Sequence, residues 1–123
     1  MSARVMIVED EVIAAMATEK MLRKLGYEVC GNVTSGEEAL ALSEALCPDI
    51  VIMDIRLDGQ LDGIDTSLKI KELCEAEVVF VSAYCDDKTR SRAQAANPRA
   101  FVSKPLDIYQ LKSILGDSPV ACH

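Results

Sequence analysis

Four positions place a charged or hydroxyl side chain directly after a short apolar run. The pair Glu9-Asp10 follows VMIV, Asp54 follows IVIM, Ser82 follows VVFV, and Lys104 follows AFVS. Carboxylates that are brought close together repel one another and raise each other's pKa unless a cation neutralises them. Oxygen-only ligands of this kind suit Mg²⁺. If the runs meet at one edge of a sheet, the sequence therefore predicts a magnesium site.

Asp54 has two possible tasks at such a site, metal ligand and nucleophile. Carboxylates attack phosphorus to give an aspartyl phosphate. The transition state of phosphoryl transfer spreads negative charge over three oxygens, to which a Mg²⁺ ion, a lysine and a hydroxyl are complementary. We therefore expect Lys104 and Ser82 to bind the oxygens of an incoming phosphoryl group.

The elements that must position these residues alternate between strands and helices along the chain. The run IVIM is too short for a helix and has no polar alternation, which is typical of a strand buried on both faces. Helical spacing of apolar residues, the possible N-caps Ser35 and Asp86 or Asp87, a capping-box pattern from Ser35 to Glu38, and the stop signal Gly26 set the helix boundaries. The predicted strands are residues 5–8, 27–33, 50–54, 77–82 and 100–103, and the predicted helices are residues 11–25, 35–46, 64–73, 86–95 and 108–115.

Strict alternation of strand and helix predicts βαβ units on a parallel sheet. With right-handed crossovers, the expected α/β fold is a three-layer (βα)5 flavodoxin-like sandwich whose five-stranded parallel sheet has the order 2-1-3-4-5. The carboxyl ends of strands one, three, four and five then converge, so that Glu9, Asp10, Asp54, Ser82 and Lys104 can meet at the edge where ligands bind.

Composition limits the partners. The chain has 123 residues, 50% of them hydrophobic, which suits one domain with one core. We assign residues 1–116 to this domain and residues 117–123 to a short tail. A formal charge of −7 argues against direct binding of nucleic acid or of an anionic membrane. No apolar run approaches a membrane span and the N-terminus lacks a signal-peptide core, so we expect a cytoplasmic protein.

The five cysteines show no pairing or zinc pattern. We expect reduced thiols, with Cys30 and Cys74 as small core or helix-face residues. A redox role for Cys85, which follows the fourth strand closely, is the minority reading.

The ordered set of motifs resembles the receiver domain of two-component response regulators, the phosphoacceptor module of bacterial signalling. The resemblance rests on VMIVEDE, VIMDIRL, FVSAY and FVSKP and covers essentially the whole chain. It implies that Asp54 is the phosphoacceptor, that the carbonyl of Arg56 ligates Mg²⁺ together with Asp10 and Asp54, and that the amides of Ile55 and Ala83 contact the phosphoryl group.

The resemblance also implies a cis peptide bond before Pro105 and an aromatic switch residue at Phe101, coupled to Ser82. Glu9 stands where aspartate is commoner in the family, so it reaches the metal directly or through water. Phe101 lacks the hydroxyl of a tyrosine, so the switch must bury or expose a ring.

The implied partners are a histidine kinase or histidine phosphotransfer protein and a downstream protein. The latter would bind the face of the fourth helix, fifth strand and fifth helix. A receiver catalyses only its own phosphorylation and dephosphorylation and is not otherwise an enzyme. The same face carries four basic residues, each of which, taken singly, we interpret as part of a solvated basic surface: Lys88, Arg90, Arg92 and Arg99.

Three other classes of protein are alternatives to an active receiver. A haloacid-dehalogenase-type hydrolase would need a second aspartate where Arg56 stands, and a flavodoxin phosphate loop is incompatible with the acidic Glu9-Asp10-Glu11. The remaining alternative is a degenerate receiver that serves as a constitutive interaction or dimerisation module. Singly, Glu9, Asp10 and Glu11 could merely cap a helix, Ser82 could be an ordinary strand-end hydroxyl and Lys104 a solvated lysine.

Overall fold

The computed structural model describes residues 3–57, 59–83 and 86–116. Cys85, Cys122, His123 and the predicted tail lie outside the described residues. The elements are β1 Arg4–Val8, α1 Val12–Lys24, β2 Glu28–Val33, α2 Gly36–Leu46, β3 Ile50–Asp54, α3 Gly63–Leu73, β4 Glu77–Ser82, α4 Asp87–Ala95, β5 Ala100–Ser103 and α5 Ile108–Leu115.

The strands form a parallel five-stranded sheet in the order β2-β1-β3-β4-β5, which confirms the predicted topology. In the register of the sheet, Asp54 on β3 lies opposite Val81 on β4, and Ser82 on β4 lies opposite Ser103 on β5. Since the strands are parallel and their ends are in step, the residues that follow them emerge at one edge.

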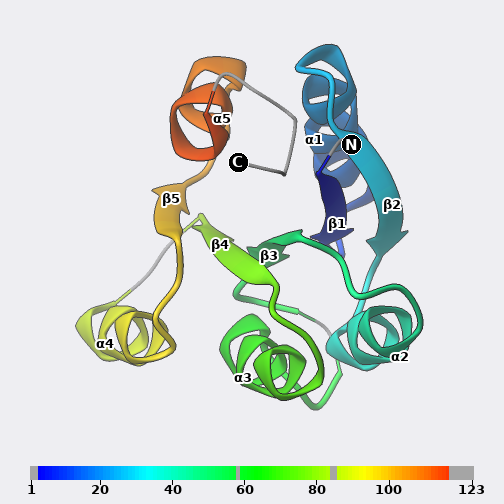
Figure 1. Cartoon of the computed structure of the whole chain (residues 1–123). Helices are drawn as coiled ribbons and strands as arrows, with labels where there is room; N and C mark the ends of the chain where they lie inside the picture. The colour runs from blue at the N-terminus through cyan, green and yellow to red at the C-terminus, as the bar shows by residue number, and fades with distance from the viewer. Residues whose placement is uncertain (1–2, 58, 84–85, 117–123) are drawn as a thin grey trace.

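Two apolar cores lie on opposite faces of the sheet (Figure 1). One includes Ala15 and Leu22 of α1 and Leu111 of α5, and the other is covered by α2, α3 and α4. All five residues of β3 are buried. Burial on both faces explains why this strand reads as an unbroken apolar run.

Local signals explain most helix ends. Gly26 follows α1 with φ of 92°, a conformation that glycine adopts without strain. The Ser35 hydroxyl accepts a hydrogen bond from the Glu38 amide, while the Glu38 carboxylate accepts from the hydroxyls of Thr34 and Ser35. Asp86, rather than Asp87, caps α4.

The reciprocal capping box lies instead at α5. The Asp107 side chain accepts from the Gln110 amide at 2.8 Å, and the Gln110 side chain accepts from the Asp107 amide at 3.1 Å. This motif was not predicted from the sequence, although its residues have the expected spacing of three.

Cys30 and Cys74 are half-buried and pack against one of the two cores, whereas Cys47 is exposed. All three are free thiols. Burial raises the pKa of both the Cys30 and the Cys74 thiol, so the protonated form predominates near neutral pH.

Candidate functional site

The predicted site residues do meet at the carboxyl edge of the sheet. Asp54 is the last residue of β3 and is 6% exposed, and Glu9, directly after β1, is also 6% exposed. Ser82 ends β4 and is buried. The Lys104 amide donates to the Ser82 carbonyl at 2.9 Å, which fixes the start of the lysine beside the end of β4.

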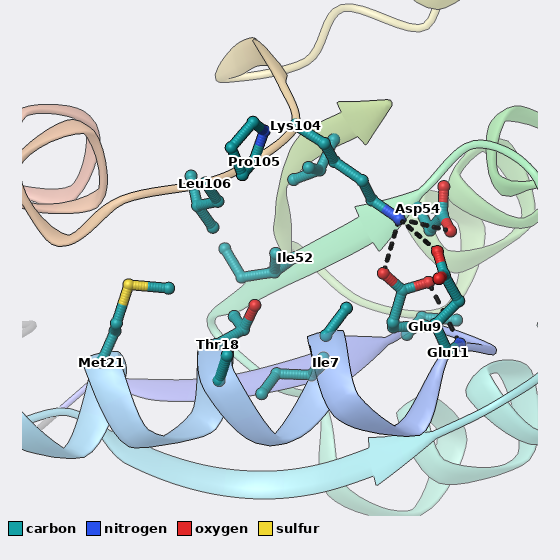
Figure 2. A pocket seen from close by; sticks show the side chains of 14 residues that line it. Ile7, Glu9, Glu11, Thr18, Met21, Ile52, Asp54, Lys104, Pro105 and Leu106 are labelled. Atoms are coloured by element: carbon teal, nitrogen blue, oxygen red, sulfur yellow. Dashed lines mark hydrogen bonds and ion pairs between the residues drawn. The ribbon is translucent and has the colours of Figure 1, made fainter. Parts of the chain in front are cut away.

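Lys104 is the electrostatic centre of this cluster (Figure 2). Its Nζ donates to Glu9 Oε1 at 2.7 Å and to Asp54 Oδ2 at 3.2 Å. A third, longer contact of 3.4 Å reaches Oε1 of the exposed Glu11. The ammonium has three donors, so these carboxylates together use its hydrogen-bonding capacity.

The charges perturb one another. Burial raises the pKa of Glu9, and the hydrogen bond with Asp54 raises it further, against the lowering effect of Lys104. Burial by itself would lower the pKa of Lys104, but the hydrogen bond to Glu9 and the charge of Asp54 outweigh it and hold that pKa well above its ordinary value. Lys104 is therefore a permanent cation at this edge of the sheet.

The donor set fits a hard divalent cation. Carboxylate oxygens of Glu9, Asp10 and Asp54 lie within 4.8 Å of one another. They carry three negative charges, of which the single ammonium of Lys104 offsets one. Because all offered ligands are oxygens and a negative excess remains, these residues suit Mg²⁺.

The backbone after Asp54 presents a hydrogen-bond donor that was not predicted from the sequence. The N–H of Arg56 donates to Asp54 Oδ1 at 3.2 Å. The N–H of Ile55, for which the resemblance implied a phosphoryl contact, donates to the Val81 carbonyl at 3.3 Å. Sequence cannot say which of two successive amides faces the carboxylate, because that depends on the path of the loop.

Gly63 allows α3 to begin against the acceptor. A Cβ atom at Gly63 would lie 2.1 Å from the backbone oxygen of Asp54. The Gly63 amide donates to the Ile55 carbonyl at 2.7 Å. Only a residue without a side chain fits here, so Gly63 is a positioning residue.

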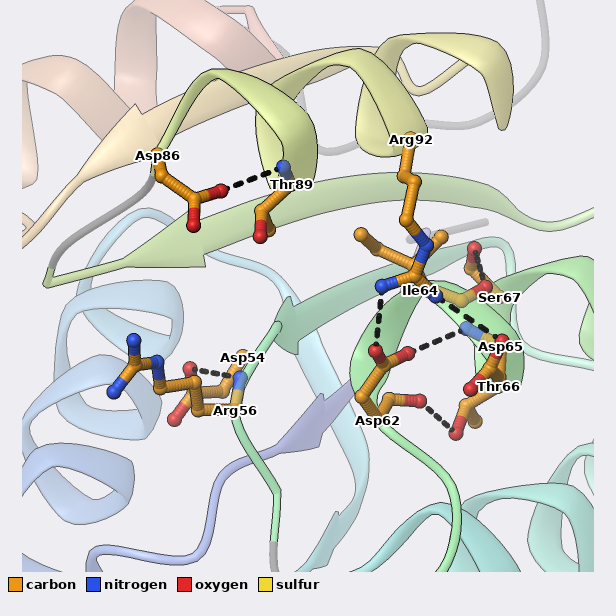
Figure 3. Close-up of polar contacts among 10 residues, drawn as sticks. All are labelled: Asp54, Arg56, Asp62, Ile64, Asp65, Thr66, Ser67, Asp86, Thr89 and Arg92. Carbon is orange, nitrogen blue, oxygen red and sulfur yellow. Dashed lines mark hydrogen bonds and ion pairs between the residues drawn. The ribbon is translucent and has the colours of Figure 1, made fainter.

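Beyond the acceptor loop, α4 is attached to α3 mainly by charged side chains (Figure 3). Arg92 pairs with Asp62, the N-cap of α3, at 3.0 Å and with Asp65 at 3.2 Å. Lys71 of α3 donates to the carbonyls of Ala96 and Asn97 at the end of α4. Ala93 is the buried residue within α4, so apolar packing anchors this helix weakly.

All four basic residues of this face are exposed, as a solvated basic surface predicts, but three of them also have partners. Arg92 is ion-paired, and Arg99 pairs with Glu77 and donates to the Ile114 carbonyl at 3.0 Å. The Arg90 guanidinium lies over the ring of Phe101. Lys88 is exposed, as expected.

A cavity of about 400 Å³ adjoins the site, between α1 and the turn that leads into α5. Its apolar wall is formed by Ala14, Ala17, Met21 and Leu106, and Lys104 lies at its charged end (Figure 2). The peptide bond between Lys104 and Pro105 in this turn is cis.

Among the helices that the structure describes, none has the length and apolar character to cross a membrane.

Comparison with known proteins agrees with this geometry. A family model described as the response regulator receiver domain matches residues 5–116. The chain is 38% identical over 108 residues to the transcriptional regulatory protein PdtaR of Mycobacterium tuberculosis, with 88% of this chain and 52% of that protein covered. It thus spans about half the length of that relative.

Two further matches cover nearly whole domains. The chain is 35% identical over 106 residues to the chemotaxis protein CheY of Thermotoga maritima, covering 85% of this chain and 88% of that protein. The crystal structure of the signal receiver domain of a modulated diguanylate cyclase from Desulfovibrio desulfuricans G20 is similar with a TM-score of 0.89 and 35% identity, covering 94% and 91% of the two chains.

Proposed function

The chain belongs to the response regulator receiver domain family, and we propose that it accepts a phosphoryl group on Asp54 from a histidine kinase or a histidine phosphotransfer protein in the cytoplasm. One observation carries the proposal. The Asp54 carboxylate is buried at the strand end, with one oxygen held by the Arg56 amide at 3.2 Å and the other by the Lys104 ammonium at 3.2 Å.

In the proposed step, a carboxylate oxygen of Asp54 attacks phosphorus. The new O–P bond forms as the P–N bond to the donor histidine breaks, and the imidazole leaves with the electron pair and takes up a proton. Lys104 stabilises the negative charge on the transferring oxygens, because its ammonium already lies beside the attacking carboxylate. The Arg56 amide already faces Asp54, and the resemblance implies the amides of Ile55 and Ala83 as further backbone donors.

Asp10, Asp54 and the carbonyl of Arg56 would hold Mg²⁺, with Glu9 directed to the same cluster directly or through water. When bound, the ion neutralises the carboxylates and the developing phosphoryl charge. Without it, the residues of the chain supply one ammonium against three carboxylates. Mutual repulsion of these carboxylates opposes the approach of a further anion.

The phosphoryl group would act on a protein-interaction face through Ser82 and Phe101. Ser82 is buried at the end of β4. Phe101 on the neighbouring β5 is half-buried and lies opposite Phe80, two residues before Ser82 on β4. We propose that the Ser82 hydroxyl turns toward a phosphoryl oxygen and that the Phe101 ring moves into the space beside β4. This would change the α4, β5 and α5 surface that a downstream protein binds.

The experiment that tests the function is intact mass after incubation with Mg²⁺ and acetyl phosphate. We expect one added phosphoryl group on the parent chain and none on Asp54→Asn. Asp62→Asn is the matched control, because Asp62 is a helix cap and should leave the added mass in place. A parent chain that gains no mass would instead favour a degenerate receiver that serves only as an interaction module.

A further inference from the structure

Glu9 has a role that its place in the acidic cluster does not suggest. Both of its carboxylate oxygens are already engaged: Oε1 accepts from Lys104 at 2.7 Å, and Oε2 accepts from the Glu11 amide at 3.4 Å. The Glu9 contact is the shortest that the Lys104 ammonium makes with a carboxylate. We propose that Glu9 is the positioning residue that holds Lys104 over the phosphoacceptor.

The order of the strands makes this contact demanding. Lys104 follows β5 and Glu9 follows β1, and both β3 and β4 lie between them in the sheet. Three strand spacings of about 4.8 Å put the two backbones roughly 14 Å apart. The extended lysine covers only part of that distance, so the length of the acidic side chain that meets it decides whether the two groups touch.

A glutamate reaches Lys104, whereas an aspartate at the same backbone position would be shorter by one carbon–carbon bond, about 1.5 Å. The present separation of 2.7 Å would grow to roughly 4 Å, beyond hydrogen-bonding distance. The side chains of Glu9 and Lys104 are 8% and 18% exposed, so solvent screens this pair only weakly.

The inference rests on the proposed function, in which the contact between Glu9 and Lys104 keeps the ammonium in place for phosphoryl transfer. Once Asp54 carries a phosphoryl group, the contact between Asp54 Oδ2 and Lys104 no longer holds the ammonium as it does in the unphosphorylated protein. Glu9 takes no part in the bond change and keeps its hold on the ammonium. The cation is thus held in place before the phosphoryl group arrives, and no reorganisation is needed at the moment of transfer.

Two substitutions separate reach from charge. Glu9→Asp keeps the negative charge but shortens the side chain. Glu9→Gln keeps the side-chain length and an acceptor oxygen but removes the charge. With acetyl phosphate and saturating Mg²⁺, we expect Glu9→Asp to be phosphorylated roughly tenfold more slowly than the parent, and Glu9→Gln to lie between them. An aspartate variant as fast as the parent, or faster than the glutamine variant, overturns the proposal.

The position of Lys104 can be measured without any phosphodonor. In protein labelled with ¹⁵N-lysine, the Lys104 ammonium should exchange slowly with solvent in the parent and in Glu9→Gln, and rapidly in Glu9→Asp. Unchanged exchange in the aspartate variant contradicts the proposal. A parent chain that gains no phosphoryl mass would refute the proposed function, yet this exchange experiment would still decide the role of Glu9.

A Mg²⁺ titration distinguishes positioning from ligation. We expect Glu9→Asp to bind Mg²⁺ within about twofold of the parent, because the charge near the metal is kept. If its affinity falls tenfold and excess Mg²⁺ restores the parental rate, Glu9 is a metal ligand and the proposal fails. Glu11→Gln is the control: Glu11 is 71% exposed and contacts the same ammonium at 3.4 Å, so its loss should change the rate less than twofold.

Discussion

The guanidinium of Arg90 on α4 lies 4.9 Å from the centre of the Phe101 ring on β5. A cation over an aromatic face is worth about 0.5–1 kcal/mol at an exposed site. Phe101 is half-buried, so the arginine covers part of the ring that the apolar core does not. The contact ties α4 to the residue that the proposed switch must move, and a signal that moves the ring has to displace Arg90.

Ser82→Ala should uncouple the phosphoacceptor from this contact. The variant lacks the hydroxyl that would turn toward the phosphoryl oxygen, a charge-assisted bond of roughly 1.5–3 kcal/mol. It should still gain phosphoryl mass, while the NMR shifts of the Phe101 ring change little. Ser103→Ala is the matched control, because Ser103 lies opposite Ser82 in the sheet but is exposed. If the Phe101 shifts of phosphorylated Ser82→Ala equal those of the phosphorylated parent, the coupling is refuted.

Asp10→Asn should weaken Mg²⁺ binding by about tenfold or more, since it removes one of three clustered carboxylate charges. The same change relieves repulsion in the metal-free protein and should raise its free energy of unfolding. Isothermal titration with Mg²⁺ and urea denaturation in EDTA measure the two effects. If the variant binds Mg²⁺ as tightly as the parent, Asp10 is not a ligand of the metal.

Asp62→Ala should lower the free energy of unfolding by about 1 kcal/mol at pH 7, because Asp62 caps α3. Burial by itself would raise the pKa of Asp62, but the Asp65 amide and Arg92 outweigh it and lower that pKa. The stabilisation is therefore present above the unfolded pKa of about 3.9 and is lost as the pH falls through the lower folded value.

Urea denaturation across that pH range tests the sign. The difference between parent and Asp62→Ala should narrow as the solution is acidified. Asp62→Asn is the control, since asparagine caps a helix without titrating. A difference that stays constant from neutral pH to below the folded pKa would show that the charge of Asp62 does not contribute.

Ser43→Ala on α2 should leave the protein as stable as the parent or more stable by about 1 kcal/mol. Ser43 is fully buried, and its hydroxyl lacks a hydrogen-bond partner within the part of the chain that the structure describes. Alanine also has the higher helix propensity.

Ser67→Ala is the matched control on α3. Ser67 is equally buried, but its hydroxyl donates to the Ile64 carbonyl at 2.8 Å. Its removal should lower the free energy of unfolding by about 1 kcal/mol. Thermal denaturation of both variants compares the two serines directly, and an equal loss at the two positions would contradict the assignment for Ser43.

The sequence by itself determined the architecture. The run IVIM before Asp54 reads as a doubly buried strand because both of its faces pack on apolar layers. The chirality of the crossovers then restricts the order of the strands. Ser35 and Asp86 cap helices through hydrogen bonds to residues three positions away, so these local signals located the starts of α2 and α4.

Only the tertiary structure decided how the side chains at the strand ends pair. Three contacts depend on how the elements are placed in space. Lys104 reaches Glu9 across two intervening strands, and Arg92 pairs with the cap of α3. The amide of Arg56, rather than that of Ile55, faces Asp54. The same holds for Gly63, whose missing side chain matters because α3 begins against the backbone of Asp54. Periodicity and capping are local and can be read from spacing, whereas these contacts depend on rotamers and loop paths that only the packed fold selects.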